Sequence, residues 1–242
     1  MTFWSRIISN AAGHALGGPL GALLRAVFGP AGAPSPSPEP HQSVAFTIAC
    51  IALCAKMAKA DGVVSRSEVD VFKRLFRVPE AELAHVGRIF DMARKDTAGY
   101  EAYARQVARL FRDYPAVREE LLDGLFSIAA ADGVLHAREL AYLQRVTALF
   151  ELPETVFARM RVLHRVDAAD DASDYALLGV APDASSQDIK TAHRKLLWEH
   201  HPDRLLAQGL PSEFIALANA RMAAINAAYD RLRSATVAAS SG

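Results

Sequence analysis

Apolar residues recur every three or four positions in two neighbouring segments towards the C-terminal end of the chain. In the first segment, 185–200, Ile189 and Leu196 mark one apolar face, so the spacing predicts an amphipathic helix. The second segment, 214–233, carries a longer series at the same spacing: Leu217, Met222, Ile225, Tyr229 and Leu232. We expect two antiparallel helices whose apolar faces pack against each other.

Polar and proline signals mark both ends of the first predicted helix. Ser185 and Asp188 have the spacing of a capping box, which satisfies backbone N–H groups at a helix start. Pro202 cannot continue a helix, and it biases the residue before it towards an extended conformation. The helix is therefore predicted to end near residue 200. This leaves a tripeptide in an exposed turn between the two helices: His201, Pro202 and Asp203.

Residues 174–233 resemble a J domain, the module named for DnaJ-type co-chaperones. The segment 174–180, Asp-Tyr-Ala-Leu-Leu-Gly-Val, is similar to the first helix of that family and its exit. Residues 189–203 are similar to its second helix and signature tripeptide, and 225–232 to its third helix. The insertion 204–211 is similar to the version in DjlA-type bacterial co-chaperones. The resemblance implies a small all-α domain with an antiparallel helical hairpin.

The J-domain resemblance implies a binding protein and not an enzyme. J domains dock on a DnaK-type chaperone and stimulate ATP hydrolysis by that partner. The signature tripeptide and a basic face would contact the partner, through His201, Pro202, Asp203, Lys190, Arg194, Lys195 and Arg204. A catalytic His–Asp pair is disfavoured, because residues on either side of a proline rarely form a hydrogen-bonded dyad and no nucleophile motif accompanies them. His193 replaces a common tyrosine of the family, and lies either at the edge of the apolar face or on the docking face.

An internal repeat occupies the middle of the chain, residues 42–167. The run 60–68 is echoed by 131–139, each with an Asp-Gly pair, and 75–80 is echoed by 149–154. Each copy predicts a helix, an Asp-Gly turn, a second helix and a third helix begun by proline. With two amphipathic stretches between the copies, the pattern predicts an all-α domain of about seven helices with pseudo-twofold symmetry. This repeat domain resembles the TerB-like (tellurite-resistance-type) helical domain, which accompanies the J domain in DjlA-type proteins.

Four carboxylates recur in the repeat domain, and the sequence leaves their role open. They would bind a divalent cation if they converged across the pseudo-twofold axis. Capping is the simpler explanation, because Gly62 and Gly133 stand where helix C-caps are expected. The spacing also lacks the additional oxygens of a calcium loop. We expect no cofactor, with a divalent cation as the alternative at Asp61, Glu68, Asp132 and Glu139.

Charge balance and cysteine content exclude several classes of protein. Lysine and arginine number 27, as do aspartate and glutamate, and this balance argues against a generic nucleic-acid binder. The two cysteines, Cys50 and Cys54, lie four apart in an apolar run and predict buried thiols in a reducing compartment. No Cys-x-x-Cys pair is present for zinc, and no phosphate loop or nucleophile elbow occurs. An interaction protein remains.

The first 28 residues raise the question of membrane attachment. The stretch 1–28 is rich in alanine, glycine and leucine, but Asn10, His14 and Arg25 interrupt it, and a spanning helix needs about 20 predominantly apolar residues. Attachment to a membrane and a loosely helical tail both stay open. The remaining predicted boundaries are a stiff Pro-rich linker at 29–41, an acidic linker at 168–173, the J domain at 174–235 and a disordered tail at 236–242.

These observations predict a co-chaperone that docks on a DnaK-type chaperone through its J domain and stimulates the partner's ATP hydrolysis. The repeat domain would provide interaction or localisation. The expected location is the cytoplasm, either free or attached to the cytoplasmic face of the inner membrane through residues 1–28. The alternative is a metal- or stress-responsive helical interaction protein in which the J domain is secondary. The sequence leaves the client proteins and the oligomeric state open.

Overall fold

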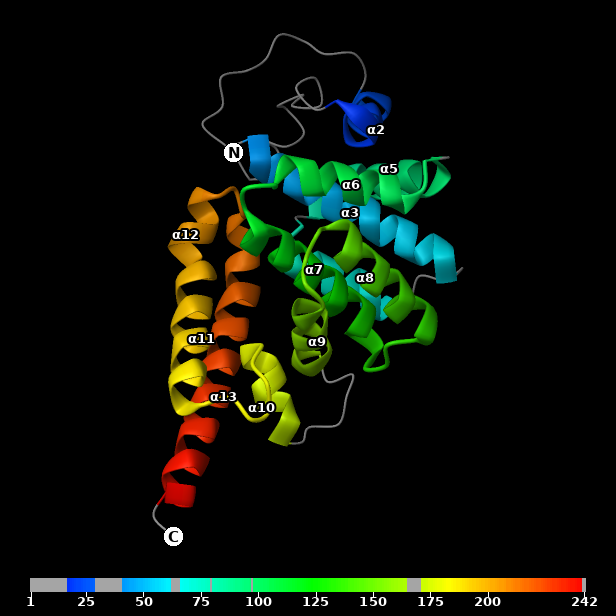
Figure 1. Cartoon of the computed structure of the whole chain (residues 1–242). Helices are drawn as coiled ribbons and strands as arrows, with labels where there is room; N and C mark the ends of the chain where they lie inside the picture. Colours follow the sequence, from blue (N-terminus) through cyan, green and yellow to red (C-terminus); the bar gives the residue numbers. More distant parts are fainter. Residues whose placement is uncertain are drawn as a thin grey trace.

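The structure, a computed structural model, is built from helices (Figure 1). It describes residues 17–28, 41–61, 66–78, 80–96, 98–164 and 171–240. No strand occurs within these ranges. The predicted all-α class, with a helical repeat domain followed by a helical J domain, is therefore confirmed.

The repeat domain is arranged around one central helix. Helix α3 is buried along residues 45–58, because α5, α6, α7 and α8 pack against it. A helix that is apolar on all sides is expected to be covered in this way. Cys50 and Cys54 lie inside it as free, buried thiols, as the sequence predicts. In the described residues the domain has seven α-helices: α3 (His41–Asp61), α4 (Arg66–Leu75), α5 (Leu83–Lys95), α6 (Tyr100–Leu110), α7 (Pro115–Ala129), α8 (Ala137–Leu149) and α9 (Glu154–Leu163).

The order of helices follows the internal repeat. The first copy spans the end of α3 and all of α4, and the second spans the end of α7, the 3-10 turn η3 (Ala130–Asp132) and α8. Gly133 ends η3 with a φ of 88°, in the left-handed region where glycine is favoured, so its predicted role as a C-cap is confirmed. Gly62 lies outside the described residues. Pro153 immediately precedes α9, as the repeat predicts.

Helix α2 (Gly18–Phe28) packs against the repeat domain (Figure 1). Leu20 and Leu23 are buried, and Gln106 of α6 holds the start of the helix. The Gln106 Oε1 atom accepts from the Leu20 N–H at 3.0 Å, and its Nε2 donates to the Gly17 carbonyl at 2.6 Å. Among the described residues, no helix has both the length and the apolar character that crossing a membrane requires. Residues 1–16 lie outside the described part, so membrane attachment stays a prediction.

The C-terminal helices form the predicted antiparallel hairpin. In Figure 1, α11 and α13 lie side by side, and α10 packs against α13. The capping box is confirmed, since the Asp188 N–H donates to Ser185 Oγ at 3.1 Å. The elements are α10 (Asp171–Leu178), α11 (Ser186–Glu199), α12 (Pro202–Ala207), the 3-10 turn η4 (Ser212–Phe214) and α13 (Ile215–Ser240). A small apolar core joins α10, α11 and α13: Leu177, Leu178, Ile189, Leu196, Ile225, Ala228 and Leu232.

Three local predictions differ from the structure. The signature tripeptide is not in an open turn but begins the short helix α12, because proline is well suited to the first position of a helix. The predicted disordered tail is helical as far as Ser240, in an alanine-rich stretch of high helix propensity. The predicted acidic linker, 168–173, is partly helical, since α10 begins at Asp171.

Candidate functional site

The signature tripeptide forms the N-terminus of α12. His201 is the N-cap residue, and its Nδ1 accepts from the Asp203 N–H at 3.3 Å. Pro202 follows at the first helical position, where its missing N–H leaves no donor unsatisfied. The His201 and Asp203 side chains are 55% and 88% exposed, with Nδ1 and Oδ2 3.9 Å apart. This geometry presents an imidazole and a carboxylate to solvent on a short, defined helix start.

The predicted basic residues of α11 are solvent-exposed. Lys190, Arg194 and Lys195 are all exposed, and Lys195 Nζ lies 4.0 Å from a Glu199 carboxylate oxygen. Charges at this spacing on an exposed helix interact weakly, so they remain available to a partner. These basic residues lie along α11, and the signature tripeptide follows the end of that helix.

An exposed tryptophan adds an apolar element that sequence reasoning missed. The guanidinium of Arg204 lies over the Trp198 ring, with its Cζ 3.4 Å from the ring centroid. Trp198 is 62% exposed, the largest exposed fraction among the big apolar side chains of the described residues. Such a cation–π contact holds both groups in place. The sequence carried a signal, because Trp198 lies on the polar side of an amphipathic helix.

His193 lies at the edge of the apolar face of the hairpin. Its ring stacks on Tyr229 of α13, with centroids 4.1 Å apart and an interplanar angle of 4°. Its Nε2 also lies 2.8 Å from Asn226 Oδ1. Of the two roles that the sequence left open for His193, the structure shows the one in packing.

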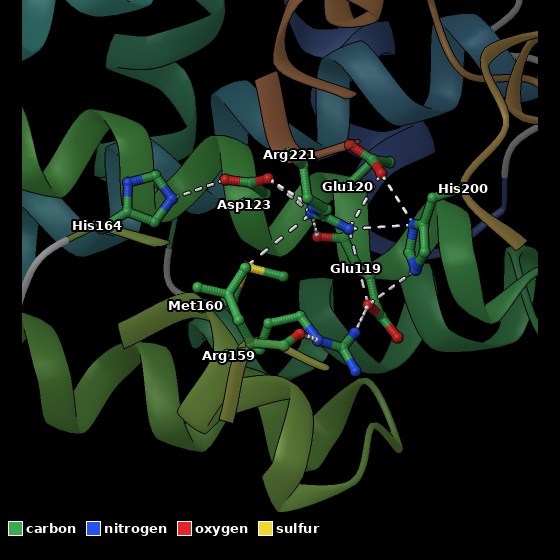
Figure 2. Close-up of polar contacts among 9 residues, drawn as sticks. Glu119, Glu120, Asp123, Arg159, Met160, His164, His200 and Arg221 are labelled. Carbon is green, nitrogen blue, oxygen red and sulfur yellow. Dashed lines mark hydrogen bonds and ion pairs between the residues drawn. The ribbon is translucent and has the colours of Figure 1, made fainter. Parts of the chain in front are cut away.

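A second group of polar residues, which the sequence analysis did not identify, lies where the end of α11 and α13 meet α7 and α9 (Figure 2). Arg221 of α13 is 2% exposed, and its guanidinium is enclosed by acidic residues of α7. Its Nε and Nη2 donate to Asp123 Oδ2 at 2.9 and 2.7 Å, and its Nη1 lies 3.1 Å from Glu120 Oε1. We call the whole group the buried ionic cluster; it consists of Glu119, Glu120, Asp123, Arg159, His164, His200 and Arg221.

His200 completes the buried ionic cluster from the J domain. It is 1% exposed, with its Nε2 3.3 Å from Glu119 Oε2 and its Nδ1 3.2 Å from Glu120 Oε1. Burial lowers the pKa of His200, but its hydrogen bonds to the two carboxylates outweigh burial, and the net shift is upward from 6.5. In the protonated form both ring N–H groups donate to carboxylates.

Two acidic members of the cluster, Glu119 and Asp123, are stabilised in the charged form. Burial raises the pKa of Glu119, but the hydrogen bond and charge of His200, with Arg159 and Arg221, lower it to about 2. Burial likewise raises the pKa of Asp123, and Arg221 and His164 lower it to about 2. The carboxylates of the cluster thus face two guanidinium groups and the rings of His164 and His200. Arg159 Nη1 lies 3.1 Å from Glu119 Oε2, which extends the cluster to α9.

Two of the four acidic residues of the repeat, Asp132 and Glu139, accept hydrogen bonds from backbone N–H groups close to them in the chain. Asp132 Oδ1 accepts from the Val134 N–H at 3.0 Å, and Glu139 Oε2 accepts from the His136 N–H at 2.8 Å. Glu68 is buried beside a cavity of about 300 Å³ between α3, α4 and α5. The Asp61 side chain lies outside the described residues. Within the described part of the chain, no three His, Cys, Asp or Glu side chains come together as metal ligands would. Cation binding stays a prediction.

Comparisons with known proteins match the two domains separately. The family described as tellurite resistance protein TerB matches residues 47–162, and the DnaJ domain family matches residues 173–237. The Co-chaperone protein DjlA of Shewanella oneidensis is 38% identical over 139 residues, which cover 51% of this chain and 53% of the relative. In both of its domains this chain is similar to the DjlA-type J-domain proteins. The insertion 204–211 forms most of α12 and the turn that follows it.

Other DjlA-type relatives match over a greater length at lower identity. The Co-chaperone protein DjlA of Photobacterium profundum is 29% identical over 215 residues, covering 78% of this chain and 76% of the relative. That of Legionella pneumophila is 25% identical over 222 residues, covering 77% and 75%. The match to the Shewanella protein spans about half the length of that relative. No solved structure matches the chain.

Proposed function

We propose that this protein is a co-chaperone that docks on a DnaK-type chaperone through its J domain and stimulates the partner's ATP hydrolysis. The observation that carries the proposal is the exposed start of α12, where His201 and Asp203 face solvent directly after the helix that carries the basic residues. The names of the DjlA relatives and the DnaJ-domain match support it. The chain itself would contribute no catalytic group, because His201 Nδ1 is engaged with a backbone N–H and no nucleophile is bonded to it.

The arrangement of charges supports docking on an acidic surface. Lys190, Arg194 and Lys195 are exposed along α11, and the Arg204 guanidinium lies over the Trp198 ring. Exposed charges of this kind mainly set the encounter rate and the orientation of two proteins. The tripeptide would then make the contact that triggers hydrolysis. Its fixed position at a helix start limits the conformational entropy that docking costs.

Steady-state ATP hydrolysis by a DnaK-type chaperone, with and without this protein, tests the proposal. We expect stimulation by the wild-type chain and a return to the unstimulated rate with His201→Gln, because glutamine cannot reproduce the imidazole at the docking surface. His136→Gln is the matched control, since His136 is an exposed histidine that precedes α8 in the repeat domain. Circular dichroism should show intact helices in both variants. Stimulation by His201→Gln equal to that of the wild type would refute the mechanism.

We also propose a cytoplasmic location, or attachment to the cytoplasmic face of the inner membrane through residues 1–28. The free, buried thiols of Cys50 and Cys54 support a reducing compartment. Cell fractionation tests this proposal, and recovery of the protein from the periplasm would contradict it. We assign the repeat domain a role in interaction or localisation.

A further inference from the structure

The insertion after the signature tripeptide is part of the core of the repeat domain. Leu205, Leu210 and Phe214 are at most 1% exposed, and they belong to the same apolar cluster as α3 and α7, together with Ala218. The J domain's own small core is a separate cluster built from α10, α11 and the middle of α13. Residues that resemble a J-domain loop therefore depend on the other domain for their burial.

Phe214 makes the most extensive of these contacts. Its ring lies edge-to-face against Phe46, at 4.7 Å between centroids, and against Phe76, at 5.0 Å. Such aromatic pairs favour defined geometries beyond the area that they bury. Gly124 of α7 provides the space, because a Cβ atom there would lie 2.8 Å from Phe214 Cε1 and 3.5 Å from Leu75 Cδ2. Since the ring is held between two other aromatic rings, it cannot move aside at low cost.

Polar contacts hold the same segment from two further sides. Ser43 Oγ, at the start of α3, donates to the Gly209 carbonyl at 2.9 Å. On the J-domain side of the interface, His200 and Arg221 meet the acidic residues of α7 in the buried ionic cluster, as Figure 2 shows. Arg159 of α9 adds a hydrogen bond from its Nε to the Leu177 carbonyl of α10 at 3.0 Å.

These contacts lie immediately before and after the signature tripeptide. His200 directly precedes His201, and Leu205 comes two residues after Asp203. The three signature residues are therefore the exposed part of a segment whose flanks are both fixed in the repeat domain. Their direction relative to α11 depends on those flanks, because α12 has only six residues and is buried through Leu205.

We propose that the repeat domain is a positioning domain for the signature tripeptide, acting through Phe214, His200 and Arg221. This inference rests on the proposed function and names the part that the TerB-type domain plays in it. The repeat domain sets the angle at which His201 and Asp203 meet the chaperone. Orientation should control the maximal stimulated rate, whereas the exposed charges of α11 should control the concentration that gives half of it.

Gly124→Ala tests the proposal, because it adds one methyl group against Phe214. Alanine has a higher helix propensity than glycine, so α7 itself is not weakened. We expect the maximal stimulated ATPase rate to fall about tenfold, since misplacing a positioned group by about 1 Å can cost up to about 100-fold. The half-maximal concentration should stay unchanged. Amide hydrogen exchange at residues 205–210 should become faster, a result that needs no chaperone.

Two further variants make the test specific. Gly87→Ala is the matched control, because Gly87 is also in a helix but has no atom within 4 Å of an added Cβ. This variant should change neither the maximal stimulated ATPase rate nor amide hydrogen exchange at residues 205–210. Phe214→Leu combined with Gly124→Ala should restore both, because leucine lacks the ring atoms that the methyl group meets. This rescue would assign the effect to the contact between the added methyl group and the Phe214 ring.

The outcomes separate this inference from the proposed function. Absence of stimulation by the wild-type chain refutes the proposed function. Two results would overturn the positioning role and leave the proposed function intact. One is full stimulation by Gly124→Ala despite faster amide exchange at residues 205–210, and the other is unchanged exchange in that variant. If Gly124→Ala does not fold, Arg221→Lys replaces it, because lysine keeps the charge but cannot contact Glu120 and Asp123 together. It should lower the maximal rate, and a wild-type rate would overturn the inference.

Discussion

His200 and His201 are neighbours in the chain but lie in opposite surroundings. His200 is 1% exposed between two carboxylates of the repeat domain, whereas the His201 side chain is 55% exposed at the start of α12. The same contrast holds for the arginines of the J domain, since Arg221 is enclosed by acidic groups and Arg194 faces solvent. Buried charges require fixed partners, and exposed charges do not. One side of the hairpin thus holds its position, while the other remains free to bind.

The largest expected loss of stability comes from a substitution in the buried ionic cluster. Arg221→Met leaves Glu120 and Asp123 buried without their guanidinium partner, and removal of one member of a buried ion pair typically costs about 3–5 kcal/mol of unfolding free energy. Arg231→Met is the matched control on the same helix. Its bidentate pair with Asp174 is 60% exposed on the arginine side, so the loss should be at most about 1 kcal/mol.

Urea denaturation of the two variants beside the wild-type chain measures this difference. Loss of equal free energy in Arg221→Met and Arg231→Met would show that burial does not distinguish the two sides of the hairpin. Replacement of the whole cluster by apolar residues would be a different experiment, because a well-packed apolar substitute can match a buried ion pair in stability.

Local signals in the sequence were sufficient to predict the exposed side of the hairpin, which carries the signature tripeptide and the charges of α11. The capping box at Ser185, the break at Pro202 and the charges of α11 all follow from neighbouring residues. The buried side was not foreseen, because Arg221 meets Asp123 across 98 positions of the chain and across two domains. Such contacts depend on how the two domains pack, and the spacing of apolar residues along the chain does not predict them.

Two signals for the buried side were nevertheless present in the sequence. The insertion and the turn that follows it are strongly apolar for a connection, with Leu205, Leu210 and Phe214, and all three are buried. Helix α7 carries Glu119, Glu120 and Asp123 among apolar residues that are buried on every side. Acidic residues in an otherwise apolar helix require buried partners, so this pattern predicts an ionic cluster without identifying its members.

A smaller effect is expected from pH, acting on the charge of His200. The raised pKa of His200 means that its contribution to stability is complete below about pH 6.5 and is lost as pH rises through the folded value. The groups that face it are Glu119 and Glu120 of α7 and Arg221 of α13, with Arg159 of α9 beside Glu119. Loss of its proton removes one positive charge from beside Glu119 and Glu120. The loss should be smaller than that in Arg221→Met, because the neutral imidazole stays in place and can still donate one hydrogen bond to a carboxylate, whereas methionine cannot.

At acidic pH the stability of the cluster changes in the opposite direction, because it is lost as pH falls. Glu119 and Asp123 both have pKa values of about 2, so their contributions are complete above their ordinary values of 4.5 and 3.8 and are lost as pH falls towards 2. Stability from the cluster should therefore be greatest between about pH 4.5 and 6.5. Urea denaturation across this range tests both limbs. His200→Gln should remove the decline above pH 6.5, and its persistence in that variant would assign the decline to another group.

The smallest expected effect comes from the exposed side. Lys190→Ala combined with Arg194→Ala should leave stability unchanged and raise the half-maximal concentration for ATPase stimulation about threefold at low salt, because exposed charges mainly steer encounter. The effect should vanish near 0.5 M salt, where the screening length falls to about 4–5 Å. Arg105→Ala combined with Arg109→Ala is the matched control, since both are exposed four residues apart on α6. An equal effect in the control would mean that overall charge, and not the face beside the signature tripeptide, guides the partner.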